Sequence, residues 1–122
     1  MQEEECFSLE TIKSELKEKG FNFEFNKSLK GKSNIEHKFD LVISDGSIVF
    51  DFISSQVPLD DIAVIRFFAK VFDVNAKKGV LVVKPRLRDS GKKLAKLYKI
   101  KTVEVENMSE KESIEAIMKL IT

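Results

Sequence analysis

The chain has 122 residues, of which 43% are hydrophobic and 34% charged, and its formal net charge is +1. This composition can build a hydrophobic core, which excludes a disordered chain and a collagen-like repeat. The single cysteine, Cys6, excludes a disulfide scaffold. No apolar run approaches the roughly 20 residues of a membrane-spanning helix, and the acidic first residues do not resemble a signal peptide. We therefore expect one domain, residues 1–122, in a cytoplasmic protein without membrane contact.

Hydrophobic periodicity predicts a mixed series of helices and strands along the chain. Apolar residues at helical spacing indicate helices, whereas alternation or short apolar runs indicate strands. The predicted elements are helix 8–19, a strand from 21, strands 34–44 and 47–54, helix 59–75, strand 79–84, helix 88–99, strand 101–105 and helix 109–121. The order α-β-β-β-α-β-α-β-α predicts an α/β fold in which helices cover both faces of a mixed sheet.

The pair Asp45-Gly46 predicts a tight hairpin between the strands 34–44 and 47–54. A two-residue turn there sets Leu41 opposite Phe50. One face of the hairpin then consists of apolar residues alone: Phe39, Leu41, Ile43, Ile48, Phe50 and Phe52. Because a slip of one residue would expose half of these side chains, their agreement supports the predicted register.

The other face of the predicted hairpin carries two facing carboxylates. Asp40 would lie opposite Asp51, with Cβ atoms about 4.5–5.5 Å apart, and Lys38 would lie opposite Ile53 beside them. Two such carboxylates repel, so one is protonated or a cation lies between them. Oxygen ligands favour a hard cation, Mg²⁺ or Mn²⁺. The alternative is that both aspartates are ordinary exposed strand residues.

These groups together predict the hydrolysis of phosphodiester bonds. Two acidic residues, a divalent metal and a lysine can hydrolyse phosphodiesters, because the metal activates water and the ammonium offsets developing negative charge. Asp40 and Asp51 are therefore predicted metal ligands and, with Lys38, predicted catalytic residues. His37, the only histidine, is expected to be a half-buried structural residue.

The segments GKSNIEHKFDLV (31–42) and IVFDFISS (48–55) resemble the motifs of the restriction endonuclease-like, or PD-(D/E)XK, nuclease superfamily. The similarity is to its Mrr-like and Holliday-junction-resolvase-like branches. It implies the restriction endonuclease-like fold, with Asp40 as the first acidic residue and Asp51 as the second. An assisting acidic residue on the first helix would be Glu10 or Glu15.

One position departs from the family pattern. The lysine expected two residues after Asp51 is Ile53, which cannot stabilise charge. Two replacements are open: Lys38, across the predicted hairpin, or Lys70 or Arg66 on the following helix. The departure puts catalysis in doubt and leaves the predicted fold unaffected.

Basic residues are concentrated in one part of the chain. Residues 77–101 contain ten Lys or Arg and one Asp, whereas residues 1–76 contain nine Lys or Arg and fourteen Asp or Glu. The predicted nucleic-acid contacts are Arg86, Arg88, Lys92, Lys93, Lys96 and Lys99. Four of them share one face of the predicted helix 88–99, where they could neutralise DNA phosphates. The alternative is a solvated helix face.

Two functions remain in competition. The first is a metal-dependent DNA endonuclease, and the second is a catalytically degenerate nuclease-fold module that binds DNA or a protein partner. A third hypothesis is a homodimer formed through the apolar helix 59–75, whose predicted interface residues are Phe67, Phe68, Val71 and Phe72.

Overall fold

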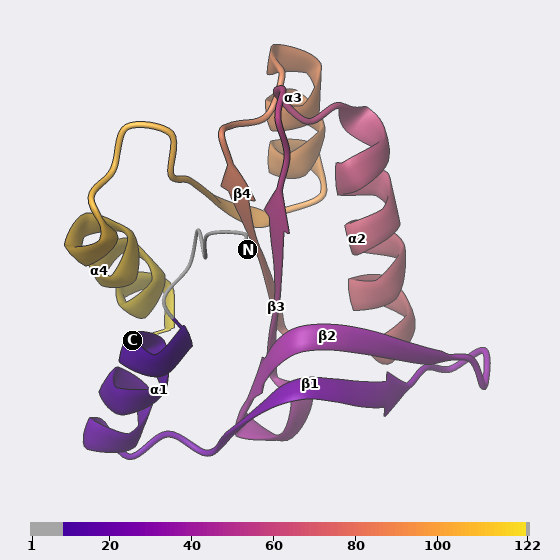
Figure 1. The fold of residues 1–122 in the computed structure, drawn as a ribbon. Coiled ribbons are helices and arrows are strands. Elements are labelled where there is room, and N and C mark those ends of the chain that lie inside the picture. Colours follow the sequence, from indigo (N-terminus) through magenta and orange to yellow (C-terminus); the bar gives the residue numbers. More distant parts are fainter. Residues whose placement is uncertain (1–8, 122) are drawn as a thin grey trace.

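A computed structural model describes residues 9–121, which form a five-stranded sheet between two layers of helices (Figure 1). Its elements are α1 (Leu9–Glu18), β1 (Phe23–Lys30), β2 (Glu36–Ile43), the 3₁₀ turn η1 (Ser44–Gly46), β3 (Ile48–Ser54), α2 (Asp61–Val74), β4 (Lys78–Lys84), α3 (Asp89–Leu97), β5 (Lys101–Glu104) and α4 (Glu110–Ile121). The predicted order of helices and strands and the mixed α/β class are confirmed. Cys6 lies outside the described residues.

The strand order in the sheet follows the chain, β1-β2-β3-β4-β5. The first three strands are antiparallel, and β3, β4 and β5 are parallel. Helices α1 and α4 lie on one side of the sheet, and α2 and α3 lie on the other (Figure 1). Within residues 9–121, no helix is long and apolar enough to cross a membrane.

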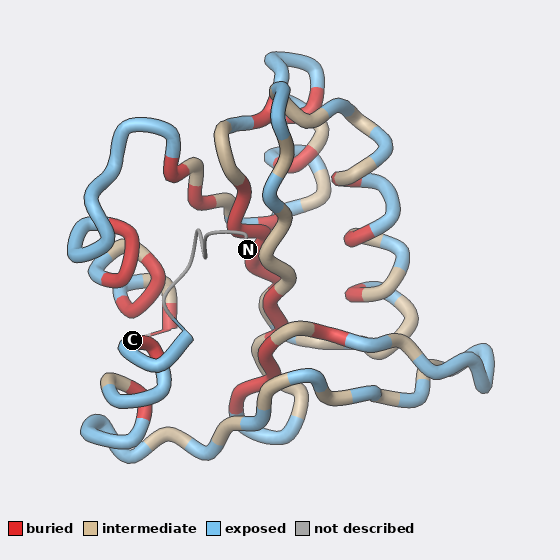
Figure 2. The backbone as a smooth tube through the Cα atoms, in the orientation of Figure 1, coloured by how far each residue is buried: buried red, intermediate tan, exposed pale blue. Residues whose placement is uncertain are grey.

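Each layer of helices closes its own hydrophobic core, and the buried segments line the sheet between them (Figure 2). On the α1–α4 side, Ile12 and Leu16 of α1 and Ile117 of α4 pack on the sheet. On the α2–α3 side, Val64 and Phe67 of α2 pack on it. The sheet is therefore covered on both faces, as the run of buried residues along β4 requires.

Helix α2 has defined ends and one buried stripe. The Asp60 carboxylate accepts a hydrogen bond from the Ile62 amide (3.1 Å), and Asn75 ends the helix in the left-handed conformation, with φ 59°. Its buried residues, Val64, Phe67 and Val71, recur at helical spacing and face the sheet.

The predicted dimer surface is largely interior. Phe67 and Val71 are 2% and 8% exposed and belong to the chain's own core, so they cannot meet a second copy. Phe68 stacks on Tyr98 of the α3 end, with ring centroids 4.1 Å apart. Phe72 alone of the four is well exposed, at 66%. Packing on the sheet and on α3 accounts for part of the apolar character of this helix, since Ile62, Ile65 and Phe72 are 53%, 46% and 66% exposed.

The predicted hairpin register is confirmed next to the turn. Asp45 and Gly46 both have positive φ (58° and 104°), as a tight hairpin turn of this kind requires. The Ser47 amide closes the turn by donating to the Ser44 carbonyl (3.3 Å). The following pairs are Ile43–Ile48, Val42–Val49 and Leu41–Phe50.

Beyond Leu41 and Phe50 the predicted register is wrong, because β2 and β3 separate there. β2 continues with β1 alone, and β3 continues beside β4. Asp40–Asp51, Phe39–Phe52 and Lys38–Ile53 are therefore not ladder pairs. The β1–β2 ribbon that leaves the sheet, residues 27–39, is called the arm here (Figure 1).

The predicted apolar face is also wrong at one residue. Phe39 packs in the α2-side core, with its ring centroid 6.4 Å from that of Phe67, whereas Leu41 lies in the α1-side core. Asn26 and Asp40 are skipped in the β1–β2 register, and Asn26 has a φ of 53°. This local break in the ribbon accounts for the exchange of faces between Leu41 and Phe39.

A first prediction concerns the contact between α2 and β4. A Cβ atom on Gly79 would lie 2.8 Å from a methyl group of Val71, so Gly79→Ala should lower the free energy of unfolding by about 1–3 kcal/mol. A Cβ on Gly91 meets only ordinary contacts, at 3.6 Å, so Gly91→Ala in α3 should raise it by about 0.5–1 kcal/mol. Urea unfolding of both variants checks the pair, and equal effects would contradict it.

Candidate functional site

The two predicted acidic residues meet where β2 and β3 separate. The Asp40 amide donates to Oδ1 of Asp51 (3.1 Å), and the Phe52 amide donates to Oδ2 of Asp40 (2.7 Å). Each carboxylate thus accepts from the backbone of the opposite strand. These bonds join the two strands beyond the end of their ladder and give both amides a hydrogen-bond acceptor. The predicted proximity of Asp40 and Asp51 is therefore present, although the strands reach it by another route.

A lysine from α2 completes this cluster. Lys70 Nζ donates to Oδ2 of Asp51 (2.5 Å) and to the backbone carbonyl of Lys38 (2.7 Å). It also lies 4.7 Å from the ring centroid of Phe39, so an aromatic face contributes to its environment. The side chains of Lys70 and Asp51 are only 25% and 14% exposed. The three residues Asp40, Asp51 and Lys70 are called the acidic cluster below.

The other predicted candidates lie outside this cluster. The Lys38 side chain is exposed and makes no hydrogen bond or ion pair with residues 9–121, and Arg66 is likewise exposed. Ile53 packs in the α2-side core. Glu10 and Glu15 belong to α1, on the opposite side of the sheet from α2 (Figure 1).

Lys70 was one of the replacements left open by the sequence, and its signal was the polar stripe of α2. Arg66, Lys70 and Asp73 recur at helical spacing on a helix that is otherwise apolar. Polar side chains that are partly buried need hydrogen-bond partners. Two of the three, Lys70 and Asp73, have partners on the strand pair β2–β3 or on the arm.

The acidic cluster is short of positive charge. It holds two carboxylates and one ammonium group. Burial raises the pKa of Asp51 above its ordinary value, although the hydrogen bond and charge of Lys70 act in the opposite direction. Within the described part of the chain, Oδ1 of Asp40 accepts no hydrogen bond. An additional cation is therefore electrostatically favoured here.

The donor set suits a hard cation only in part. Both carboxylates offer oxygen atoms, which Mg²⁺ and Mn²⁺ prefer. Residues 9–121 contain no group of three or more His, Cys, Asp or Glu side chains placed to hold a metal. An ion bound by Asp40 and Asp51 would keep water in its remaining positions, as Mg²⁺ commonly does.

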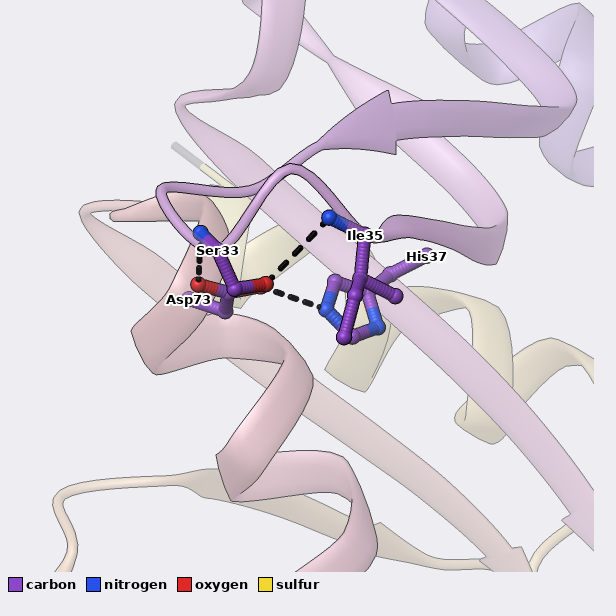
Figure 3. Close-up of polar contacts among 4 residues, drawn as sticks. All are labelled: Ser33, Ile35, His37 and Asp73. Carbon is purple, nitrogen blue, oxygen red and sulfur yellow. Dashed lines mark hydrogen bonds and ion pairs between the residues drawn. The ribbon is translucent and has the colours of Figure 1, made fainter.

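A second polar cluster holds the arm against the end of α2 (Figure 3). Oδ1 of Asp73 accepts from the Ser33 amide (3.0 Å), and Oδ2 accepts from the Ser33 hydroxyl (2.6 Å) and lies 2.7 Å from His37 Nε2. The Lys32 amide donates to the backbone carbonyl of Asp73 (2.9 Å). These contacts among Ser33, His37 and Asp73 are called the latch. His37 is half-buried and structural, as its pattern predicts.

The latch requires glycine at position 31. A Cβ atom there would overlap with the Asp73 carboxylate, far inside van der Waals contact. The hydrogen bonds from Ser33 and then His37 hold the pKa of Asp73 below its ordinary value. The hydroxyl of Ser33 donates to Asp73 and not to His37, so the three side chains are not arranged as a nucleophile and its base.

The predicted nucleic-acid contacts are all exposed, and they surround α3. Arg86 and Lys92 form ion pairs with Glu106 (3.4 Å) and Glu104 (3.7 Å). Arg88, Lys93, Lys96 and Lys99 are exposed without an ion pair among residues 9–121. The predicted four-residue helical stripe is too long, because α3 ends at Leu97 and Lys99 has a φ of 61°.

The fold is similar to that of a solved protein of unknown function, AF1548, with a TM-score of 0.68 and 21% identity over 91% of this chain and 63% of that chain. The apo structure of EndoMS gives a TM-score of 0.46 and 18% identity over 87% of this chain and 49% of that chain. The chain thus spans less than two-thirds of either protein. No family and no curated protein matches it. At this identity, the first similarity shows the shared α/β fold alone.

A second prediction concerns the pH dependence of the latch. Because the pKa of Asp73 is lower in the folded chain, its carboxylate stabilises the fold above the ordinary aspartate pKa of about 3.9, and this contribution disappears as the pH falls through the lower folded value. Asp73→Ala should therefore lower the Tm at pH 5–7, and the difference from the unchanged chain should shrink towards pH 2. Thermal unfolding monitored by circular dichroism checks this, and a difference independent of pH would contradict it.

Proposed function

We propose that this chain is a restriction endonuclease-like domain that binds DNA and hydrolyses its phosphodiester bonds with Mg²⁺ or Mn²⁺. Asp40 and Asp51 hold the metal, and Lys70 supplies the positive charge that Ile53 cannot. The observation that carries the proposal is the contact of Lys70 with Asp51, which restores a lysine to the acidic pair from a different element.

The metal would be held by the two carboxylates of the acidic cluster. Their oxygen atoms support a hard divalent cation, as does Oδ1 of Asp40, which accepts no hydrogen bond from residues 9–121. Such an ion, when bound, polarises a phosphoryl oxygen and lowers the pKa of a bound water. Three of the four carboxylate oxygens already accept hydrogen bonds, which holds both groups in place for the ion.

Lys70 is suited to stabilise charge that develops on a phosphate. Its ammonium group is fixed by the Lys38 carbonyl and Asp51, so it needs little reorganisation during a reaction. It has three donors, of which the structure uses two, and the third is available for a phosphoryl oxygen. The Phe39 ring beneath it limits its exposure to water.

The basic residues around α3 would bind the DNA backbone. α3 packs against α2, the helix that carries Lys70, and both lie on one side of the sheet (Figure 1). The Ser90 hydroxyl donates to Asp61 (2.5 Å), which ties the two helices together. A DNA duplex that contacts α3 would thus lie on the same side of the molecule as the acidic cluster.

A third prediction separates Lys70 from Lys38. Lys70→Met should reduce metal-dependent cleavage of DNA by at least about 100-fold, since one charge-stabilising donor commonly contributes that much to a rate. Lys38→Met is the matched control, because it removes an exposed lysine of the arm and leaves the Lys38 carbonyl, which Lys70 contacts, in place. Cleavage of duplex, branched and single-stranded DNA with Mn²⁺ provides the measurement.

Equal DNA cleavage by Lys70→Met and Lys38→Met would contradict a catalytic role for Lys70. Loss of cleavage in Lys38→Met alone would return the catalytic role to Lys38. Absence of cleavage by the unchanged chain on every substrate would favour the degenerate module, a second candidate supported by Ile53 at the lysine position of the motif.

A fourth prediction tests DNA binding. Changing Arg88, Lys93 and Lys96 together to Glu should weaken binding to duplex DNA and lower the slope of log affinity against log salt by about 1 for each phosphate that the variant no longer neutralises. The control changes Lys13, Lys17 and Lys111 to Glu, which are exposed on α1 and α4 and alter the net charge equally. Fluorescence anisotropy at several salt concentrations measures both. An equal reduction in both triple variants would indicate a nonspecific effect of net charge.

A further inference from the structure

We propose that Asp73 is a positioning residue: through the latch it holds the arm in the place that keeps Asp40 beside Asp51. The consequence for metal binding and cleavage rests on the proposed function, but the positioning itself does not. The inference assigns a role to Ser33, His37 and Asp73, which take no part in the acidic cluster.

The first step is that the arm lacks support from the sheet. The part of β2 that precedes Leu41 is not paired with β3, and β1 is its only ladder partner. β1 is itself an edge strand. A two-stranded ribbon is at best marginally stable by itself, so the arm needs contacts with another element.

The second step is that α2 supplies those contacts from neighbouring positions on its polar stripe. Lys70 donates to the Lys38 carbonyl (2.7 Å). One turn further, Asp73 accepts from Ser33 and lies against His37 (2.7 Å). Asp40 is three residues from His37 on the same strand, so a shift of the arm at the latch moves the strand that carries this carboxylate.

The third step is that the contacts of the Asp73 side chain are with the arm and not with its own helix. It lies in the last turn of α2, where the helix dipole disfavours a negative charge. Its carboxylate is compensated by donors from the arm alone among the described residues: the Ser33 amide, the Ser33 hydroxyl and the His37 ring. The depressed pKa of Asp73 agrees with this compensation.

The fourth step is that the arm is shaped around this carboxylate. Gly31 leaves the space that Asp73 occupies, and the backbone of Lys32 pairs with the Asp73 carbonyl. Asn34, at the tip, adopts a φ of 73°, which brings the chain back from Ser33 to β2. Backbone and side chains of the tip thus converge on one residue of α2.

The test is hydrogen exchange at the amides of Asp40 and Phe52, which join β2 to β3 beyond their ladder. It is measured by NMR without metal or DNA. The amides of Asp40 and Phe52 donate to the opposite carboxylates. In Asp73→Ala both should exchange at least about tenfold faster, relative to amides of β4 such as that of Leu81, because the bonds that hold them open with the arm. Normalising to β4 separates this effect from a general loss of stability.

Two further variants complete the experiment. Asp61→Ala is the matched control, since Asp61 lies on the same helix and accepts a hydrogen bond from Ser90 of α3 rather than from the arm. It should leave the exchange of Asp40 and Phe52 unchanged relative to β4. Ser33→Ala keeps Asp73 and removes only the hydroxyl donor, so it should give an intermediate acceleration even if Asp73→Ala does not fold.

Unchanged relative exchange at Asp40 and Phe52 in both latch variants would overturn the proposal. It would mean that the remaining contacts hold the arm without the latch: Lys70 on the Lys38 carbonyl, Phe39 on Phe67, and the Lys32 amide on the Asp73 carbonyl. If the exchange responds but the unchanged chain neither binds Mn²⁺ nor cleaves DNA, the positioning role stands and the proposed nuclease function fails. If both hold, Asp73→Ala should also weaken Mn²⁺ binding, because it loosens the strand that carries Asp40.

Discussion

The separation of β2 from β3 beyond the Leu41–Phe50 pair, on the side away from the turn, is the constraint on which the candidate site depends. Backbone amides within a fold need partners, and the amides of Asp40 and Phe52 lie just beyond the last ladder pair of β2 and β3, Leu41–Phe50. The carboxylates of Asp51 and Asp40 take the place of the missing carbonyls. The requirement to satisfy two amides therefore brings two negative charges together at the point where the strands separate.

Two charged residues on the polar stripe of α2 contact the strands at this separation. Lys70 enters the acidic cluster and offsets part of its charge, while Asp73 holds the arm that β2 forms with β1. Phe67 also holds α2 in place, because its ring packs on that of Phe39 in β2. Apolar packing and polar contacts thus both join α2 to β2. Two carboxylates share one ammonium group in the acidic cluster, and this imbalance favours a divalent cation there.

Much of the fold follows from local patterns in the sequence. Asp45-Gly46 predicted the turn, and the apolar alternation predicted the three ladder pairs next to it. The pattern failed at Asp40 because alternation assumes that paired strands continue together. Nothing local to Phe39 indicates that it would enter the α2-side core. The positive φ of Asn26, a residue type that tolerates it, is the nearest signal for the change.

The candidate site was predictable only in part, because local patterns do not show tertiary contacts. Asp40 and Asp51 follow from the hairpin, since both lie one residue beyond its last ladder pair. The choice between Lys38 and Lys70 depends on how the arm turns against α2, which is a tertiary contact without a sequence period. The latch was missed because its members, Ser33, His37 and Asp73, each carry no distinctive signal alone. Only the packing of the arm brings them together.

The proposed function requires that Asp40 and Asp51 bind a divalent metal ion. Calorimetric titration of Mn²⁺ into the unchanged chain and into Asp51→Asn measures this binding, because the substitution removes one charged ligand with little change of shape. We expect the unchanged chain to bind about one ion per chain and the variant to lose this binding. No binding at millimolar Mn²⁺, or equal binding by both proteins, would contradict it and would leave the acidic cluster as a structural join between two strands.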